Sequence, residues 1–178
     1  MEAFRLGRRA AAASLLAVAP IILGSTGLRT NFDERILAAH NRERSAVGVP
    51  PLQWNDELAA GAKQWANHLA RTGSFEHSPD EPGAEPIGEN LWGGTPDAYA
   101  PDAMVGLWIS EKQHFKTGIF PSNSRTGKVD DVGHYTQLIW RKSAEVGCAL
   151  SRGRSEEVLV CRYSVAQVYR GHDRALLQ

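Results

Sequence analysis

The sequence predicts one domain that mixes α-helices with β-strands, an α+β fold. Two observations lead to this prediction: three stretches repeat apolar residues at helical spacing, and two short apolar stretches near the end of the chain are separated by a turn. The chain has 178 residues, of which 42% are hydrophobic, and this is enough material for one core. We therefore expect a single folded domain, preceded by a short N-terminal segment of different composition.

The first two helices are predicted over residues 33–47 and 55–73. In the first, the face expected to be buried holds Ile36, Leu37 and His40. Arg44 is assigned with the other charged residues to the solvent face. The second helix has Asn55 as its N-cap, acidic residues in its first turn and Gly73 at its end. This second helix has the clearest helical signature in the sequence.

A short strand is predicted over 87–92 and a third helix from Asp102 onward. Alternation along the strand places Glu89 on the same face as two apolar residues, where a carboxylate is unusual unless it has a partner. In the helix, Glu111 follows Trp108 by three residues, so the two side chains share one side. Both carboxylates are therefore expected beside apolar surfaces.

The last two strands, 146–150 and 158–163, read as a hairpin around the turn 153–156. With residue 153 paired to 156, Cys148 falls directly opposite Cys161. Opposed antiparallel residues are about 4.5 to 5.5 Å apart at Cα, which is within the range of a disulfide. We predict this bridge for an oxidising compartment, with two buried free thiols as the alternative.

Residues 1–27 have the composition of an export signal. A basic start is followed by the uncharged apolar run 10–23. This run is shorter than the 20 or so residues of a spanning helix and contains Pro20. A cleaved signal is the prediction and a retained anchor is the alternative. The Arg8-Arg9 pair leaves the general and the twin-arginine routes both open.

Charge and motifs exclude several functions. The chain has 20 basic and 20 acidic residues, and the part after the export segment is slightly acidic, so no nucleic-acid partner is expected. There is no Gly-x-Ser-x-Gly elbow, phosphate-binding loop or His-Glu-x-x-His motif. One Glu-x-x-His pair is present, Glu111 with His114, whereas carboxylate di-iron sites use two such pairs.

One segment is highly characteristic of a known family. Residues 133–140, Gly-His-Tyr-Thr-Gln-Leu-Ile-Trp, followed by Val-Gly-Cys-Ala at 146–149, strongly resemble the signature of the CAP superfamily, which includes the cysteine-rich secretory proteins, the antigen-five proteins and the pathogenesis-related class-one proteins. Further segments resemble the family in the same order: His40-Asn41 with Arg44, then 51–55, 75–78, 88–91 and 108–111. Residues 32–178 are therefore identified as a CAP domain.

The resemblance implies a three-layer α-β-α sandwich with a central antiparallel sheet and a short helix in place of the alternating stretch 134–140. It also implies a cavity lined by four polar residues, His77, Glu89, Glu111 and His134. One departure is found at Val165 to Val168, where the family usually has two prolines and then Gly-Asn. Any function of that turn is in doubt here.

Function is expected to follow from these four residues. The two histidines can bind a divalent metal such as Zn²⁺, with the two glutamates holding the imidazoles. We expect an extracellular or periplasmic, non-catalytic module that binds a small apolar ligand such as a sterol or fatty acid, without a transmembrane domain in its mature form. The alternatives are a metal-dependent hydrolase or peptidase that uses Glu89 and Glu111, an extracellular protein-interaction domain, and a purely structural polar network.

Overall fold

A computed structural model describes residues 29–79, 83 and 86–164. The expected export segment, 1–27, and the altered segment Val165 to Val168 lie outside these residues. The described helices are α1 (Phe32–Ala46), α2 (Asp56–Thr72), α3 (Pro101–Ser110) and α4 (Gly133–Leu138), with short 3-10 helices η2 (Glu111–Gln113) and η3 (Val129–Val132). The strands are β1 (Gln53–Trp54), β2 (Gly88–Gly94), β3 (Glu145–Arg152) and β4 (Glu157–Tyr163).

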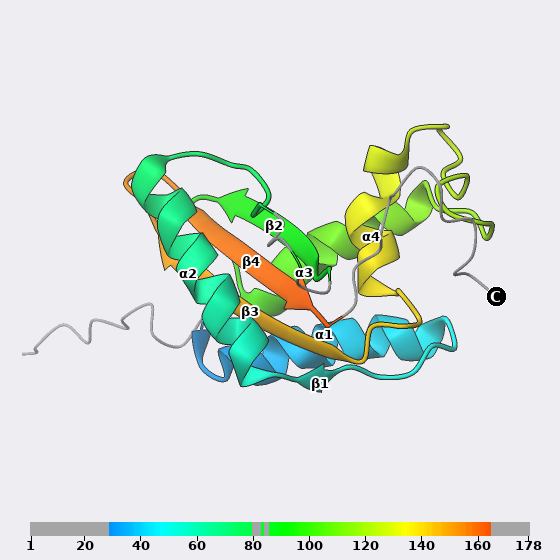
Figure 1. The fold of residues 1–178 in the computed structure, drawn as a ribbon, viewed down its shortest axis with the longest axis horizontal. Helices are drawn as coiled ribbons and strands as arrows, with labels where there is room; N and C mark the ends of the chain where they lie inside the picture. The colour runs from blue at the N-terminus through cyan, green and yellow to red at the C-terminus, as the bar shows by residue number, and fades with distance from the viewer. Residues whose placement is uncertain (1–28, 80–82, 84–85, 165–178) are drawn as a thin grey trace, which may run out of the picture.

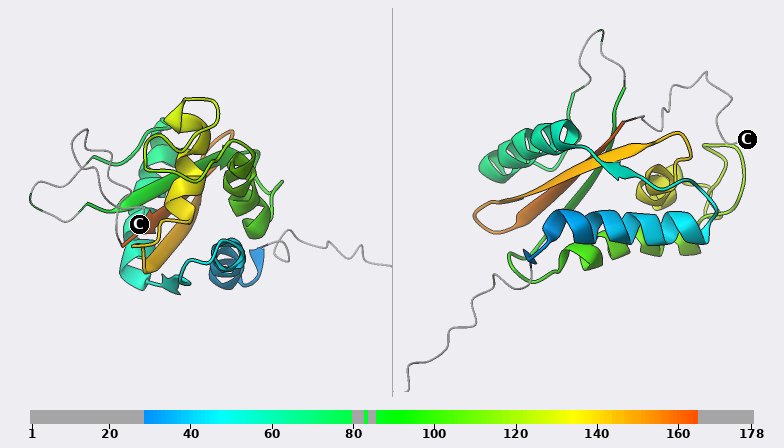
Figure 2. Two further views of the ribbon diagram at one scale, coloured as in Figure 1. Left: turned by 90° about the vertical axis from the view of Figure 1, so that its right-hand side faces the viewer. Right: turned by 90° about the horizontal axis from the view of Figure 1, so that it is seen from below.

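The elements form the three-layer sandwich that the sequence resemblance implied. Helix α2 covers one face of the sheet, while α1, α3 and α4 lie on the other (Figures 1 and 2). The strand order is β1-β3-β4-β2, and β4 pairs antiparallel with both neighbours. The sheet also has the two-residue strand β1, parallel to β3 at one edge. A strand this short has no alternation to detect, so the sequence did not predict it.

Alternation along the strands divides the core between the two faces of the sheet. The face toward α2 buries Leu91, Ala149, Val158 and Val160 against Ala62, Ala66 and Leu69 of the helix. The opposite face buries Trp92, Val146, Cys148, Leu159, Cys161 and Tyr163 against residues of α1, α3 and α4. Neighbouring residues of one strand therefore belong to different layers.

The predicted hairpin and disulfide are confirmed. The backbone N–H of Gly153 donates to the carbonyl of Glu156 at 2.8 Å, which closes the turn. Cys148 pairs with Cys161 across β3 and β4, and their Cα atoms are 4.1 Å apart in a formed disulfide. Both cysteines are therefore committed to the bridge.

The helix ends follow their local sequence signals. Asn55 Oδ1 accepts from the N–H groups of the second and third residues of α2, and Gly73 ends this helix with φ 73°. Helix α3 starts at Pro101, one residue before the predicted start, because proline suits the first turn. The short helix that the family resemblance implied over 134–140 is present as α4.

The prediction for Arg44 was wrong. This side chain is fully buried. Its guanidinium donates to four backbone carbonyls, those of Pro50, Leu138, Trp140 and Ser143, at 2.7 to 2.9 Å. Arginine has five N–H donors and no acceptor, so it can satisfy the carbonyls left free where α4 ends. Arg44 thus ties the C-terminal end of α4 to α1.

Within the part of the chain that the structure describes, none of the helices has both the length and the apolar character needed to cross a bilayer.

Candidate functional site

The first histidine–glutamate pair lies on the α2 side of the sheet. Strand β2 places Glu89 on the same face as Leu91, and only 6% of the Glu89 side chain is exposed. Its Oε1 accepts from Nδ1 of His77 at 3.0 Å and from the backbone N–H of Ser78 at 2.9 Å. Its Oε2 accepts from the Ser78 hydroxyl at 2.8 Å and from Nε of Arg162 at 3.3 Å. Glu89 therefore has hydrogen-bond partners, as expected for a carboxylate on an apolar face of a strand.

The electrostatics of this pair follow from its donors. Burial acts to raise the pKa of Glu89, but the hydrogen bonds from His77 and Ser78, together with the charge of Arg162, lower it below its ordinary value. The hydrogen bond to Glu89 raises the pKa of His77. An ionised carboxylate only accepts, so Nδ1 of His77 carries a proton, and in the neutral ring Nε2 has the lone pair. Most of this side chain, 63%, is exposed.

Arg162 reaches Glu89 because the two residues face each other across β2 and β4. Gly61 of α2 makes room for the guanidinium. A Cβ atom at this position would come within 2.8 Å of one of the guanidinium nitrogens. A residue with a side chain at position 61 would therefore force the guanidinium of Arg162 to shift.

The second pair lies beyond the other face, where α3 passes into η2. Oε1 of Glu111 accepts from Nδ1 of His134 at 2.6 Å, and Oε2 accepts from the backbone N–H of Tyr135 at 3.0 Å. The Tyr135 N–H belongs to the first turn of α4, where backbone donors lack partners within the helix. The His134 ring stacks on Trp108 with an interplanar angle of 8° and centroids 6.1 Å apart. Glu111 and Trp108, which were predicted to share one side of the helix, thus both contact the ring of His134.

The two pairs are neighbours on either side of β2. The residue after Glu89, Asn90, points to the opposite face, and its Nδ2 donates to the backbone carbonyl of His134 at 3.1 Å. No hydrogen bond joins one pair to the other within 29–79, 83 and 86–164. Over the same ranges, no group of three or more His, Cys, Asp or Glu residues is placed to hold a metal ion. The structure thus pairs His77 with Glu89 and His134 with Glu111, one pair on each side of β2.

Sequence reasoning missed four residues that support these pairs: Ser78, Asn90, Arg162 and Tyr163. All four occur in segments that resemble the family or in a predicted strand. The role of Ser78 depends on how its loop returns to Glu89, and those of the other three depend on the pairing of β2 with β4 and on the position of α4 over β2. For Arg162, the signal was the unexplained carboxylate of Glu89, which required a cation somewhere in the fold.

Comparisons with known proteins agree with this architecture. A family model described as "CAP: Cysteine-rich secretory protein family" matches residues 37–163. Pathogenesis-related protein 1A of Nicotiana tabacum is 37% identical over 143 residues, which are 79% of this chain and 79% of that protein.

Two solved structures show the same fold. "Crystal Structure of Na-ASP-1" matches with a TM-score of 0.65 and 23% identity, over 83% of this chain and 42% of that one. "Crystal structure of NaASP2 with Zn2+" matches with a TM-score of 0.61 and 20% identity, over 75% and 78%. The family match, the relative and the fold all agree, and the chain belongs to the CAP family of cysteine-rich secretory proteins.

Proposed function

We propose that the protein is an exported CAP binding module in which His77 and His134 present their Nε2 atoms to a divalent metal. One observation carries this proposal: each imidazole donates Nδ1–H to a glutamate. Histidines that ligate metals commonly have this arrangement, because the carboxylate fixes the tautomer and orientation of the ring.

The donor set fits zinc bound weakly. Neutral imidazole nitrogen is a good zinc ligand, and 63% and 35% of the two histidine side chains are exposed. Two imidazoles are fewer than the four ligands of a closed structural site, so water would complete the coordination. Bound zinc would supply Lewis acidity, whereas His77 and His134 only hold it.

The hydrogen bonds of the carboxylates favour binding over hydrolysis. A general base needs a free oxygen within reach of the proton that it accepts. Both oxygens of Glu89 are occupied and its pKa is lowered, which makes it a weak base. Each oxygen of Glu111 accepts one hydrogen bond and retains a second lone pair. Glu89 is therefore the weaker candidate base of the two, and because of it the hydrolase is the less favoured function.

Export and the apolar ligand are further parts of the proposal. The disulfide and the family's description as secretory fit an extracellular location. We infer removal of about the first 25 residues, supported by their signal-like composition. The small apolar ligand, a sterol or fatty acid, is supported by the family resemblance. N-terminal sequencing of exported protein and mass spectrometry of its lipid extract test these two parts separately.

Calorimetric titration with zinc at pH 7.5 tests the metal site. His77→Ala and His134→Ala should each lose most of the binding seen in the wild type. His68→Ala is the control, because His68 stacks on Trp65 of α2 and belongs to neither pair. Protonation competes with the metal, so affinity should fall below a pH of about 6.5. If both alanine variants bind zinc as the wild type does, the four residues form a structural network only.

A further inference from the structure

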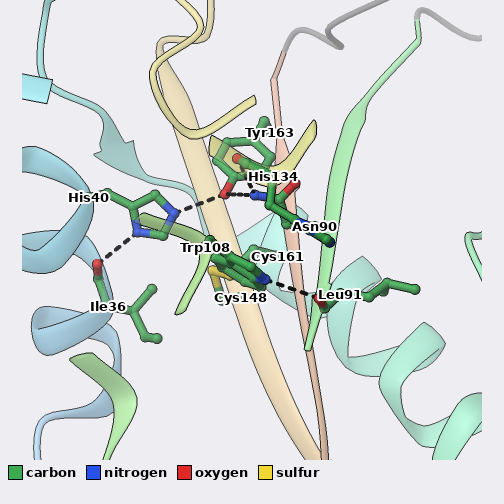
Figure 3. Close-up of a disulfide and its surroundings, with 9 residues drawn as sticks. All are labelled: Ile36, His40, Asn90, Leu91, Trp108, His134, Cys148, Cys161 and Tyr163. Atoms are coloured by element: carbon green, nitrogen blue, oxygen red, sulfur yellow. Dashed lines mark hydrogen bonds between the residues drawn. A yellow bond between two sulfur atoms is a disulfide. The ribbon is translucent and has the colours of Figure 1, made fainter. Parts of the chain in front are cut away.

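A buried row of hydrogen bonds runs from α1 to the backbone of His134 (Figure 3). Nδ1 of His40 lies 2.8 Å from the carbonyl of Ile36, and its Nε2 lies 2.9 Å from the hydroxyl of Tyr163. Asn90 Nδ2 donates to the same hydroxyl and to the carbonyl of His134, each at 3.1 Å. Three elements, α1, β4 and β2, thus contribute one side chain each to a path that ends at the second residue of α4.

Each hydrogen bond in this row has a defined direction. A carbonyl only accepts, so Nδ1 of His40 carries the proton. Burial lowers the pKa of His40 to about 4, which leaves Nε2 as an acceptor at neutral pH. The Tyr163 hydroxyl therefore donates to His40 and accepts from Asn90. The opposite orientation of the Asn90 amide would place its oxygen against the His134 carbonyl, so that orientation is excluded.

Burial makes the row costly to break. The three side chains of His40, Asn90 and Tyr163 are 0 to 2% exposed. A buried donor or acceptor that loses its partner cannot form a hydrogen bond to water in its place, which costs free energy. The side chains of the row are therefore held in one arrangement. Three packed elements therefore determine the position of the His134 carbonyl.

The other contacts of His134 then fix its ring. Glu111 binds Nδ1 at 2.6 Å and Trp108 stacks on the face. Trp108 is itself held, since its Nε1 donates to the carbonyl of Leu91 at 3.0 Å, one residue along β2 from Asn90. With the backbone, one nitrogen and the ring face all held, Nε2 has one direction left.

We propose that Asn90 and Tyr163 are positioning residues, which transmit the fixed geometry of His40 on α1 to His134 and thereby aim its Nε2 at the ligand. This inference rests on the proposed metal function for its role, but its geometry can be tested without metal. A hydrogen bond to a glutamate is not sufficient for this purpose. His77 has the same kind of bond to Glu89, but among the described residues it has neither a stacked tryptophan nor a side chain that holds its carbonyl.

The decisive experiment compares Asn90→Leu with the wild type by NMR and calorimetry. Leucine has a similar volume but no donor. The ring protons of His134 should be shifted by the stacked Trp108 ring in the wild type, and this shift should be largely lost in Asn90→Leu. Zinc affinity should fall roughly tenfold, as it does when groups that orient a metal-binding histidine are removed. The same substitution in a His134→Ala background should have no further effect on zinc affinity.

Two more variants keep the test decisive. Tyr163→Phe retains the ring and should give a smaller change of the same kind, so it serves if Asn90→Leu does not fold. Ser151→Ala removes a hydroxyl that donates to Asn67 on the α2 side, and it should leave the His134 shift unchanged.

Two results would overturn the inference. The first is a folded Asn90→Leu variant, or Tyr163→Phe in its place, in which the His134 ring protons keep the wild-type chemical shift. The second is a change of the His134 chemical shift in Ser151→Ala as large as that in Asn90→Leu. Absence of zinc binding in the wild type would instead overturn the metal proposal and leave the NMR result to decide the positioning role.

Discussion

The two histidine–glutamate pairs contain the same side chains but are held in different ways. In the pair on the α2 side, the carboxylate is the fixed partner: Glu89 is 6% exposed and accepts from the backbone, a hydroxyl and a guanidinium, while 63% of the His77 side chain is in solvent. In the other pair the imidazole is the fixed partner. His134 lies on a helix, stacks on Trp108 and has its carbonyl held by Asn90.

This difference shows that a hydrogen bond from Nδ1 to a glutamate does not by itself determine how firmly a histidine is positioned. For His77, the orientation of the ring depends on the charge and donors around Glu89. For His134, it depends on the backbone of α4 and on the elements that hold this helix. The pairs should therefore respond to different substitutions, and the following predictions separate them from the largest expected effect to the smallest.

Arg44→Met should be the most damaging change. Methionine fills much of the same space but removes the donor to four carbonyls, three of them in buried hydrogen bonds. We expect a loss of about 3 to 5 kcal/mol in the free energy of unfolding, measured with urea. Any folded protein should lose the ring-current shift of His134 and retain the titration of His77. Arg42→Met on the exposed side of α1 is the control, and an equal urea midpoint for both variants would refute the prediction.

Glu89→Gln should destabilise the other pair by roughly 1 to 3 kcal/mol at pH 7, since Arg162 loses its counter-charge and the new amide group meets donors. The folded-state pKa of Glu89 lies below its ordinary value of 4.5. Its contribution is therefore present above that pH and is lost as the pH falls through the folded-state value. The difference in urea midpoint between the wild type and Glu89→Gln should become smaller as the pH falls. Glu76→Gln, in the loop next to His77, is the control and should have the urea midpoint of the wild type.

His77 should titrate above 6.5, its ordinary value, in an NMR titration of the wild type, because Glu89 stabilises the protonated ring. In Glu89→Gln the midpoint should return toward 6.5. A raised folded-state pKa means that the stabilisation is complete below pH 6.5 and is lost as the pH rises through the folded-state value. The effect on unfolding is expected to be small, since most of this ring is in solvent. An unchanged midpoint in Glu89→Gln would show that Glu89 does not control His77.

Ser78→Ala should have the smallest effect. It removes the hydroxyl bond to Oε2 of Glu89 but leaves the backbone N–H bond to Oε1. We expect a loss of less than about 1 kcal/mol in urea unfolding, with His77 still titrating above 6.5. Ser74→Ala in the same loop is the control. A loss as large as that of Glu89→Gln would mean that the hydroxyl, rather than the charge of Arg162, holds the carboxylate.

Features encoded over a few residues could be predicted from the sequence. The cap at Asn55 and the turn that sets Cys148 opposite Cys161 are both local, and both are confirmed. The sandwich and the short helix α4 came from the family resemblance, since the stretch 134–140 alternates like a strand. Local patterns alone did not lead to them.

The supporting residues could not be predicted because their partners are distant in sequence. Glu89 and Arg162 meet only when β2 pairs with β4, and hydropathy does not encode which strands pair. Arg44 is different, because residues 36, 40 and 44 are four apart and so share one helix face. Its charge suggested solvent, whereas the free carbonyls at the end of α4 make the interior favourable for a guanidinium.

The hairpin that carries the disulfide also has a consequence for the order of folding. Cys148 and Cys161 are 13 residues apart in sequence, so they can meet through a short loop closure, whereas β2 joins β4 from about 70 residues upstream. Oxidation of this hairpin needs no other part of the sheet in place. Once formed, the bridge reduces the entropy of the unfolded chain and so raises its free energy by roughly 3 kcal/mol at room temperature. During folding, we expect the covalent bond to form early and to leave β4 ready to pair with β2, the strand that carries Glu89 and Asn90.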